Sequence, residues 1–196
     1  MRQQERLGKE RISSLTDHLG DRADSNKRFY LTVNSRLESL ATVQQWFENL
    51  LNYCSDLSPA PYFWVGEAFD QLNLALAEGF TNAVRHAHVN LPSHTPIVLE
   101  CWVQFNQVEI RIFDQGEPFD PDSLVEPQPG TLREGGYGWF LLRRLVDEVT
   151  YERAQPDFLM KRLFDSQSVH STDTYVTPSR ADIQQVCNCL KLVKTA

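Results

Sequence analysis

Three short clusters of glycine and polar residues interrupt the apolar pattern of this 196-residue chain, and they limit what it can fold into. The clusters are Glu78-Gly-Phe-Thr-Asn82-Ala-Val-Arg-His86, Asp114-Gln-Gly116-Glu-Pro-Phe-Asp120 and Gly135-Gly-Tyr-Gly138. The surrounding patterns predict that the first cluster lies on a helix, the second ends a strand and the third opens a helix. A fold that brings these three places together would create one ligand site.

A strand and two helices are predicted in the first half of the chain. The β-branched and aromatic run at 29–33 predicts a strand. Asn34 or Ser35 can cap a helix whose apolar positions recur at three- and four-residue steps as far as Leu51. Two prolines at 58–61 end that helix, and the next is predicted from about residue 62 to 87. Its apolar stripe includes Leu72, Leu76, Phe80 and Ala83.

The second half of the chain predicts two hairpins separated by a loop and a short helix. The first hairpin joins 97–105 to 108–113, because the second of these segments alternates between apolar and polar residues. Four prolines and five glycines between residues 115 and 138 predict a long loop of the kind that covers a site. A short amphipathic helix is predicted at 139–146, and a final hairpin joins 149–153 to 158–164.

The length of the chain suits one well-buried domain and is short for two. We expect a polar N-terminal extension over residues 1–27, one domain over residues 28–165, and a polar C-terminal tail over residues 166–196. The tail holds a possible short helix between about residues 181 and 192.

Glu78, Asn82 and His86 follow one another at four-residue steps, so on a helix they share one stripe. A stripe of this kind is usually a solvated helix face. The neighbouring Gly79 favours a different interpretation, because a glycine inside a helix costs about 1 kcal/mol relative to alanine and suggests close packing or the approach of a ligand. The stripe is therefore a candidate for one wall of a cleft.

Asp114 follows an apolar strand directly, where an aspartate often serves only to make a turn. A carboxylate fixed at a strand end can instead accept a hydrogen bond from the exocyclic amine of adenine. Gly116, two residues on, would then let the base approach the backbone. Both interpretations are open from these residues alone.

The run from Gly135 through Gly136 to Gly138 precedes a helix, whose exposed N–H groups and dipole suit phosphate oxygens. Arg133 could add a contact to a terminal phosphate or be a solvated loop residue. The chain has no phosphate-binding loop of the G-x-x-x-x-G-K-[ST] type, so any nucleotide must be held in another way.

Together, in this order, the three clusters resemble the N, G1 and G2 boxes of the GHKL ATPases, and most closely those of the anti-sigma factor serine kinases. The resemblance covers about residues 28 to 165. It implies an α+β two-layer sandwich of the Bergerat type, with a mixed, mostly antiparallel sheet and helices on one face. ATP would lie between a helix and a lid formed by about residues 121 to 134.

The resemblance also implies roles for single residues. Glu78 would be the general base that activates a substrate serine, and Asn82 would coordinate Mg²⁺. Asp114 would read adenine, with Gly116 giving room for the base. The remaining candidates for nucleotide contacts are His86, Arg133, Gly135, Gly136 and Gly138.

The family resemblance implies a sigma factor, an anti-anti-sigma antagonist protein, or both as partners, and it suggests a homodimer. The formal net charge of −7 argues against direct nucleic-acid binding. No apolar run approaches the roughly 20 residues that cross a bilayer, and the first ten residues do not resemble a signal peptide, so we expect a cytoplasmic protein. Two other functions stay open: a module that only sequesters a partner, and an interaction protein whose three boxes have decayed.

Overall fold

The computed structural model of the chain describes residues 26–57, 59–124, 137–157, 179–186 and 188–196. Five strands form one sheet in the order β1-β2-β3-β5-β4, and all four neighbouring pairs are antiparallel. The strands are β1 Asn26–Asn34, β2 Pro96–Gln104, β3 Gln107–Asp114, β4 Glu148–Arg153 and β5 Asn188–Thr195. The predicted α+β class is confirmed. Among these five strands none of the pairings is parallel, so this part of the sheet is not mixed.

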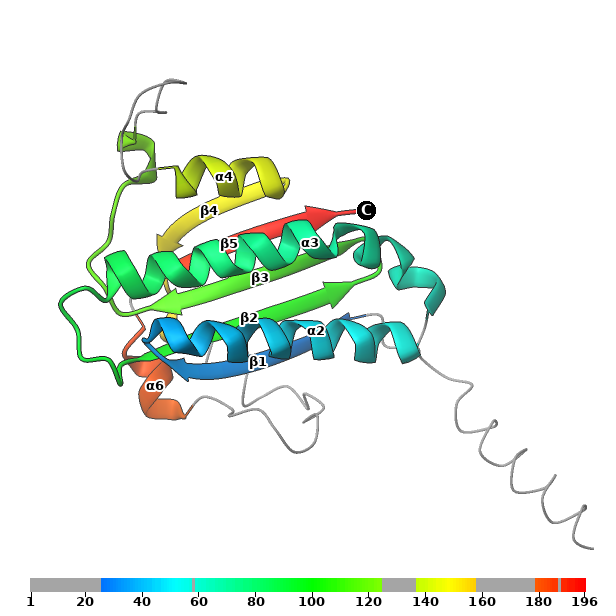
Figure 1. Cartoon of the computed structure of the whole chain (residues 1–196). Helices are drawn as coiled ribbons and strands as arrows, with labels where there is room; N and C mark the ends of the chain where they lie inside the picture. The colour runs from blue at the N-terminus through cyan, green and yellow to red at the C-terminus, as the bar shows by residue number, and fades with distance from the viewer. Residues whose placement is uncertain (1–25, 58, 125–136, 158–178, 187) are drawn as a thin grey trace, which may run out of the picture.

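Three helices cover one face of the sheet, as predicted (Figure 1). They are α2 Leu40–Leu57, which a 3₁₀ turn at Leu37–Ser39 precedes, α3 Pro59–Asn82 and α4 Gly138–Leu145. The main core lies between these helices and the inward side chains of the strands. Its largest fully buried members include Trp46, Phe47, Leu72, Phe80, Ile110 and Leu142. None of the helices in the described ranges is long and apolar enough to cross a membrane.

Gly79 sets how closely α3 approaches the sheet. A Cβ at this position would come within 2.7 Å of Ile112 Cδ1 and 2.8 Å of Leu190 Cδ2, both on the sheet below. Of the two reasons that the sequence offered for this glycine, close packing therefore applies.

The helix α6 Arg180–Gln184 packs on the opposite face of the sheet (Figure 1). Ser179 caps it, because its side chain accepts a hydrogen bond from the Asp182 N–H while the Asp182 carboxylate accepts one from the Ser179 N–H. Ile183 and the following Val186 are buried against residues of three strands, Val98, Phe113 and Cys189. This helix is an exception to the prediction that helices cover only one face.

The last strand corrects the prediction of a polar tail after residue 165. β5 is an interior strand between β3 and β4, and its side chains are buried alternately on the two faces of the sheet, with Leu190 and Leu192 facing the main core. The predicted helix is realised only at 180–184. β4 pairs with β5, whereas the predicted partner at 158–164 lies outside the described residues.

We expect Leu192→Ala to destabilise the protein strongly, since Leu192 is fully buried on an interior strand. The cost should be about 2 to 5 kcal/mol in the free energy of unfolding, measured by chemical denaturation. The matched control is Leu74→Ala, because Leu74 is 47% exposed on α3 and its loss should change stability by no more than about 0.5 kcal/mol. Equal stabilities of the two variants would show that β5 does not contribute to the core.

Candidate functional site

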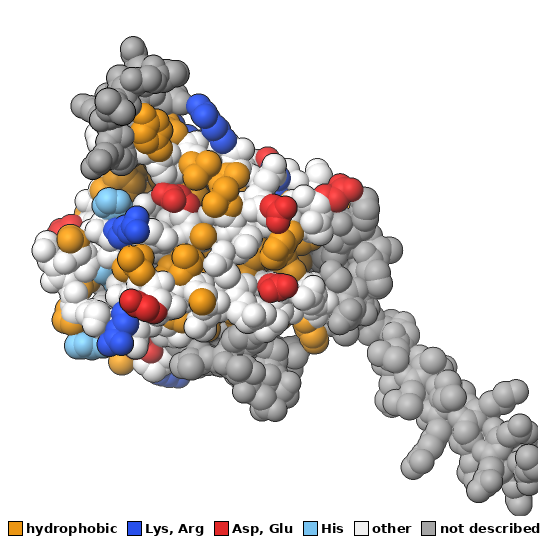
Figure 2. Space-filling model, in the orientation of Figure 1, with side chains coloured by type: hydrophobic (Ala, Val, Ile, Leu, Met, Phe, Trp, Pro, Cys, Tyr) orange, Lys and Arg blue, Asp and Glu red, His pale blue; other side chains and the backbone are white. Residues whose placement is uncertain are grey.

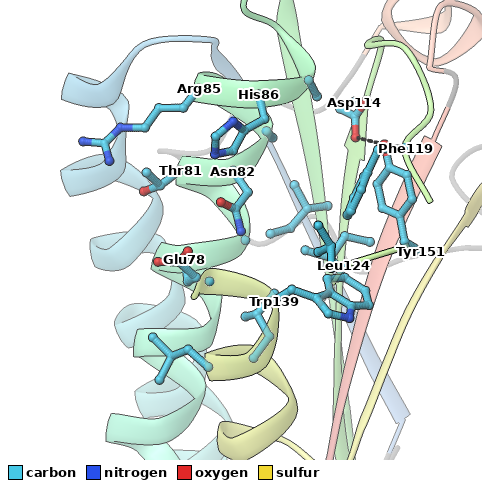
Figure 3. Close-up of a pocket in the computed structure, with 18 of the residues that line it drawn as sticks. Glu78, Thr81, Asn82, Arg85, His86, Asp114, Phe119, Leu124, Trp139 and Tyr151 are labelled. Carbon is cyan, nitrogen blue, oxygen red and sulfur yellow. Dashed lines mark hydrogen bonds between the residues drawn. The ribbon is translucent and has the colours of Figure 1, made fainter. Parts of the chain in front are cut away.

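A cavity of about 590 Å³ lies where α3, the end of β3 and the start of α4 meet (Figure 3). All three sequence clusters contribute to its walls, through Glu78, Asn82 and His86, through Asp114, and through Gly138. The volume lies within the range of pockets that hold small ligands and cofactors. The fold therefore brings together places that are 60 residues apart in the chain.

The polar stripe of the first cluster faces this cavity. Glu78 and Asn82 lie on the last turns of α3, half-buried, and point toward the start of α4 (Figure 3). Leu72, Leu76 and Phe80 lie on the opposite side of the helix and are fully buried in the core. The stripe is a cavity wall rather than an open solvated face.

After Asn82 the helix widens into a π-helical turn at Ala83–Ala87, which ends with the hydrogen bond from the His88 N–H to the Ala83 carbonyl. Such turns interrupt helices most often at functional sites. Arg85 and His86 are exposed on this turn and line the cavity. Figure 2 shows basic and histidine side chains gathered at the end of this face where α3 ends in Figure 1.

Gly138 is the first residue of α4 and lies against α3. A Cβ at this position would overlap the Glu78 carboxylate and would come within 3.3 Å of Asn82 Nδ2. A larger residue at this position would require the Glu78 side chain to move away from the start of α4. Glu78, Asn82 and Gly138, predicted separately from two clusters, thus form one group.

Asp114, at the end of β3, is only 3% exposed and is held by neutral donors. Its Oδ1 accepts hydrogen bonds from the Gly116 N–H at 2.9 Å and from Asn188 Nδ2 at 2.8 Å. Its Oδ2 is 3.4 Å from the Tyr151 hydroxyl, which donates to it (Figure 3). The hydrogen bond from the Gly116 N–H shows that Asp114 stabilises the turn after β3. Because Asp114 also lines the cavity, a role in ligand binding stays open.

Asn188 completes this end of the site, and no sequence cluster indicated it. It is the first residue of β5, directly opposite Asp114 in the β3–β5 ladder, and it is 1% exposed. One amide group donates both to Asp114 and to the Gly116 carbonyl, each at 2.8 Å. The sequence signal for it is weak, because the run at 188–195 mixes lysines with apolar residues and indicates a strand only once its place beside β3 is known.

Gly116 was expected to give room for a base, but in the structure the backbone of Ala87 fills the space that a side chain at this position would take. A Cβ at this position would overlap the Ala87 carbonyl at the end of the π-helical turn. The glycine is required because two backbone segments meet there. Gly116 is buried and does not line the cavity.

His88, which follows the π-helical turn, binds the backbone between Asp114 and Gly116. Its Nε2 accepts a hydrogen bond from the Gln115 N–H at 2.9 Å, so this nitrogen must carry no proton. Burial lowers the pKa of His88 below its usual 6.5, although Asp114 nearby acts in the opposite direction. A neutral His88 therefore fixes the backbone between Asp114 and Gly116.

Aromatic side chains line the part of the cavity next to Asp114. The Phe119 ring lies 4.7 Å from the Tyr151 ring and packs edge-on against Trp139, at 5.8 Å between ring centroids. Trp139 is buried, and among the described residues its Nε1 has no hydrogen-bond partner.

Three of the predicted site residues, Arg133, Gly135 and Gly136, lie outside the described residues, as does most of the predicted lid. Within the described ranges, no three His, Cys, Asp or Glu side chains gather as they would around a metal ion. The Asn82 side chain lines the cavity, where it could be one ligand among others.

Comparison with known proteins gives a family match over most of the described core. Residues 33–157 match the histidine kinase-like ATPase domain family. Among individual proteins, the chain is 35% identical over 91 residues to the serine-protein kinase RsbW of Oceanobacillus iheyensis, which covers 42% of this chain and 57% of the relative. It is 37% identical over 97 residues to RsbW of Staphylococcus epidermidis, covering 43% and 60%. RsbW of Listeria monocytogenes is 31% identical over 91 residues, covering 42% and 57%. The chain thus spans less than two thirds of the length of these relatives.

We expect His88 to make stability depend on pH. The unfolded chain binds a proton at His88 near pH 6.5, whereas the folded protein binds it only at lower pH. This contribution is therefore fully present above about pH 6.5 and is lost as the pH falls through the folded pKa.

The variant His88→Gln, whose amide oxygen can still accept from Gln115, should lose part of this dependence. The drop in stability between about pH 7.5 and about pH 5.5 should shrink, by at most about 1.4 kcal/mol, because only about one pH unit of this range lies below pH 6.5. His94→Gln, at an exposed loop position, is the matched control. A drop in His88→Gln as large as in wild type would contradict the role of His88.

Proposed function

The chain belongs to the histidine kinase-like ATPase domain family, and we propose that it is an ATP-dependent serine protein kinase of the anti-sigma factor type. One observation carries this proposal. A single cavity has the buried carboxylate of Asp114 at one end and the group of Glu78, Asn82 and Gly138 at the other. A nucleotide needs one surface that binds its base and a second surface that binds its phosphate chain, and the two must lie apart in the same cavity. The relatives named serine-protein kinases support the reaction type.

The cavity suits a nucleotide on chemical grounds. Its aromatic and aliphatic walls next to Asp114 suit a purine ring, and the exposed Arg85 and His86 bring basic groups to the π-helical turn that lines the cavity. Asp114 would accept a hydrogen bond from the exocyclic amine of adenine. The N–H groups at the start of α4, at Gly138 and in the preceding Gly135 and Gly136, would bind phosphate oxygens, together with Arg133.

When bound, ATP supplies the phosphoryl group and Mg²⁺ neutralises its developing charge. Asn82 would hold the metal through its amide oxygen, with phosphate oxygens as further ligands. Glu78 lies one helical turn before Asn82, so its carboxylate would lie near the phosphate end of the cavity.

Glu78 would act as the general base. Its carboxylate would accept the proton of a serine hydroxyl on a bound protein as that oxygen attacks the terminal phosphate. Gly138 leaves room for the carboxylate in the position that it occupies in the structure, because a Cβ there would overlap it. Positioning of the serine and of the phosphate would provide most of the catalysis, as is usual for phosphoryl transfer.

The partners that we propose are a sigma factor, which the protein would sequester, and an antagonist protein, whose serine it would phosphorylate. Partners of this kind imply a cytoplasmic protein that does not itself contact nucleic acid. A homodimer remains an expectation from the family resemblance.

We expect Mg-ATP to raise the melting temperature of the wild-type protein and not that of Asp114→Asn. Ligand at 100 times its Kd should stabilise the folded state by about 2.7 kcal/mol, a shift of roughly 5 to 10 °C. Asn at position 114 can keep the hydrogen bonds to Oδ1, but it replaces the Oδ2 acceptor with a donor that repels the amine of adenine. No shift in wild type would refute nucleotide binding and leave only a sequestering module.

Glu78→Gln should separate binding from catalysis. The variant should keep most of the shift with Mg-ATP, while transfer of phosphate to a copurified antagonist should fall by at least about a hundredfold, the usual contribution of a general base. Phosphate on the antagonist can be measured by mass spectrometry after single-turnover incubation. Transfer at the wild-type rate would remove Glu78 from the proposed mechanism.

A further inference from the structure

The two oxygens of the Asp114 carboxylate have different environments. Oδ1 accepts two short hydrogen bonds, from the Gly116 N–H at 2.9 Å and from Asn188 at 2.8 Å. A carboxylate oxygen has two lone pairs, so Oδ1 has no capacity for a third strong donor. The ladder pairing of Asp114 with Asn188 makes this arrangement part of the sheet rather than of a loop.

The second oxygen faces a hydroxyl group. Among the described residues, the only hydrogen bond to Oδ2 comes from the Tyr151 hydroxyl, at 3.4 Å, and this distance is long for an O–H···O bond. Tyr151 lies on β4, two strands away from Asp114, opposite Leu190 of β5. Asp114, Tyr151 and Leu190 all line the cavity. At this end, the cavity therefore presents an acceptor, Oδ2, beside a donor, the hydroxyl.

We propose that this acceptor–donor pair selects adenine over guanine, with Asn188 as the residue that enforces the selection. The inference rests on the proposed binding of ATP and adds the residues that choose the base. Adenine carries an N6–H donor next to the N1 acceptor on one edge. Asp114 Oδ2 accepts from N6–H, and the Tyr151 hydroxyl turns from Oδ2 to donate to N1.

Guanine does not fit the same position. Its O6 acceptor would face the Oδ2 acceptor, and two acceptors repel each other. The arrangement in which a carboxylate binds guanine uses both oxygens, one for N1–H and one for N2–H. Asn188 and the Gly116 N–H prevent that arrangement, because they already occupy Oδ1. Buried polar groups left unpaired by the wrong base make such discrimination steep.

The first test pairs Tyr151→Phe with an ATP analogue in which carbon replaces N1, 1-deaza-ATP. Dissociation constants for ATP and 1-deaza-ATP are measured by calorimetry with wild type and variant. We expect wild type to bind ATP roughly tenfold more tightly than the analogue, because the analogue offers the hydroxyl no acceptor on the base. In Tyr151→Phe the two ligands should bind within about twofold of each other, because the donor is absent from both complexes. Tyr53→Phe, a matched control on α2, should keep the wild-type ratio.

The second test uses Asn188→Ala and compares ATP with GTP. Freeing one lone pair of Oδ1 should raise the affinity for GTP relative to ATP by roughly tenfold or more. If Asn188→Ala does not fold, the Tyr151→Phe measurement still decides for or against the acceptor–donor pair.

The outcomes separate this inference from the function on which it rests. ATP bound by wild type, with the same analogue penalty in wild type and Tyr151→Phe, would overturn the inference and leave the proposed function intact. No binding of ATP by wild type would overturn both. Tight binding of GTP by wild type would also contradict the assigned selection.

Discussion

The pairing of β5 between β3 and β4 is the interaction on which the rest of the structure depends. It places Leu190 and Leu192 in the main core, and it brings β4, with Tyr151, into the sheet. It also places Asn188 opposite Asp114, where one amide orients both the carboxylate and the Gly116 carbonyl. Core and site therefore form together: a change that loosened β5 would weaken the packing and release the carboxylate at the same time.

Close approach between neighbouring elements is the second constraint, and three glycines contribute to it. Gly79 lets α3 lie on the sheet, Gly116 lets the turn after β3 meet the Ala87 carbonyl, and Gly138 lets α4 begin beside Glu78. Each is needed at a different contact between elements, and together they fix the relative positions of α3, β3 and α4. The cavity walls come from these same elements, so the packing of the elements against one another sets the width of the cavity.

The local parts of this arrangement could be predicted from the sequence. The helix carrying Glu78 and Asn82, the hairpin that ends at Asp114 and the short helix after Gly138 each have a clear pattern of apolar spacing. The partner of β4 could not be predicted in the same way, because β5 begins 35 residues after β4 ends, and its pairing is decided by sheet contacts. A run such as Asn188–Thr195, with lysines among its apolar residues, is ambiguous between helix and strand until its neighbours are known. Asn188 and Tyr151 were missed for the same reason, since their importance depends on which strands they face.

The distribution of charged side chains along the cavity determines which ligand groups each part of it can bind. In the described part of the chain no lysine or arginine pairs with Asp114, and its carboxylate is held instead by an amide, a backbone N–H and a hydroxyl. A cation on this carboxylate would compete with a ligand amine for Oδ2, whereas neutral donors on Oδ1 leave Oδ2 available to it. His88 is consistent with this arrangement, because burial lowers its pKa and favours the neutral ring that accepts from Gln115. The exposed basic residues Arg85 and His86 lie instead on the π-helical turn. The end of the cavity that contains Asp114 can therefore discriminate by hydrogen-bond direction, while the turn can attract negative charge.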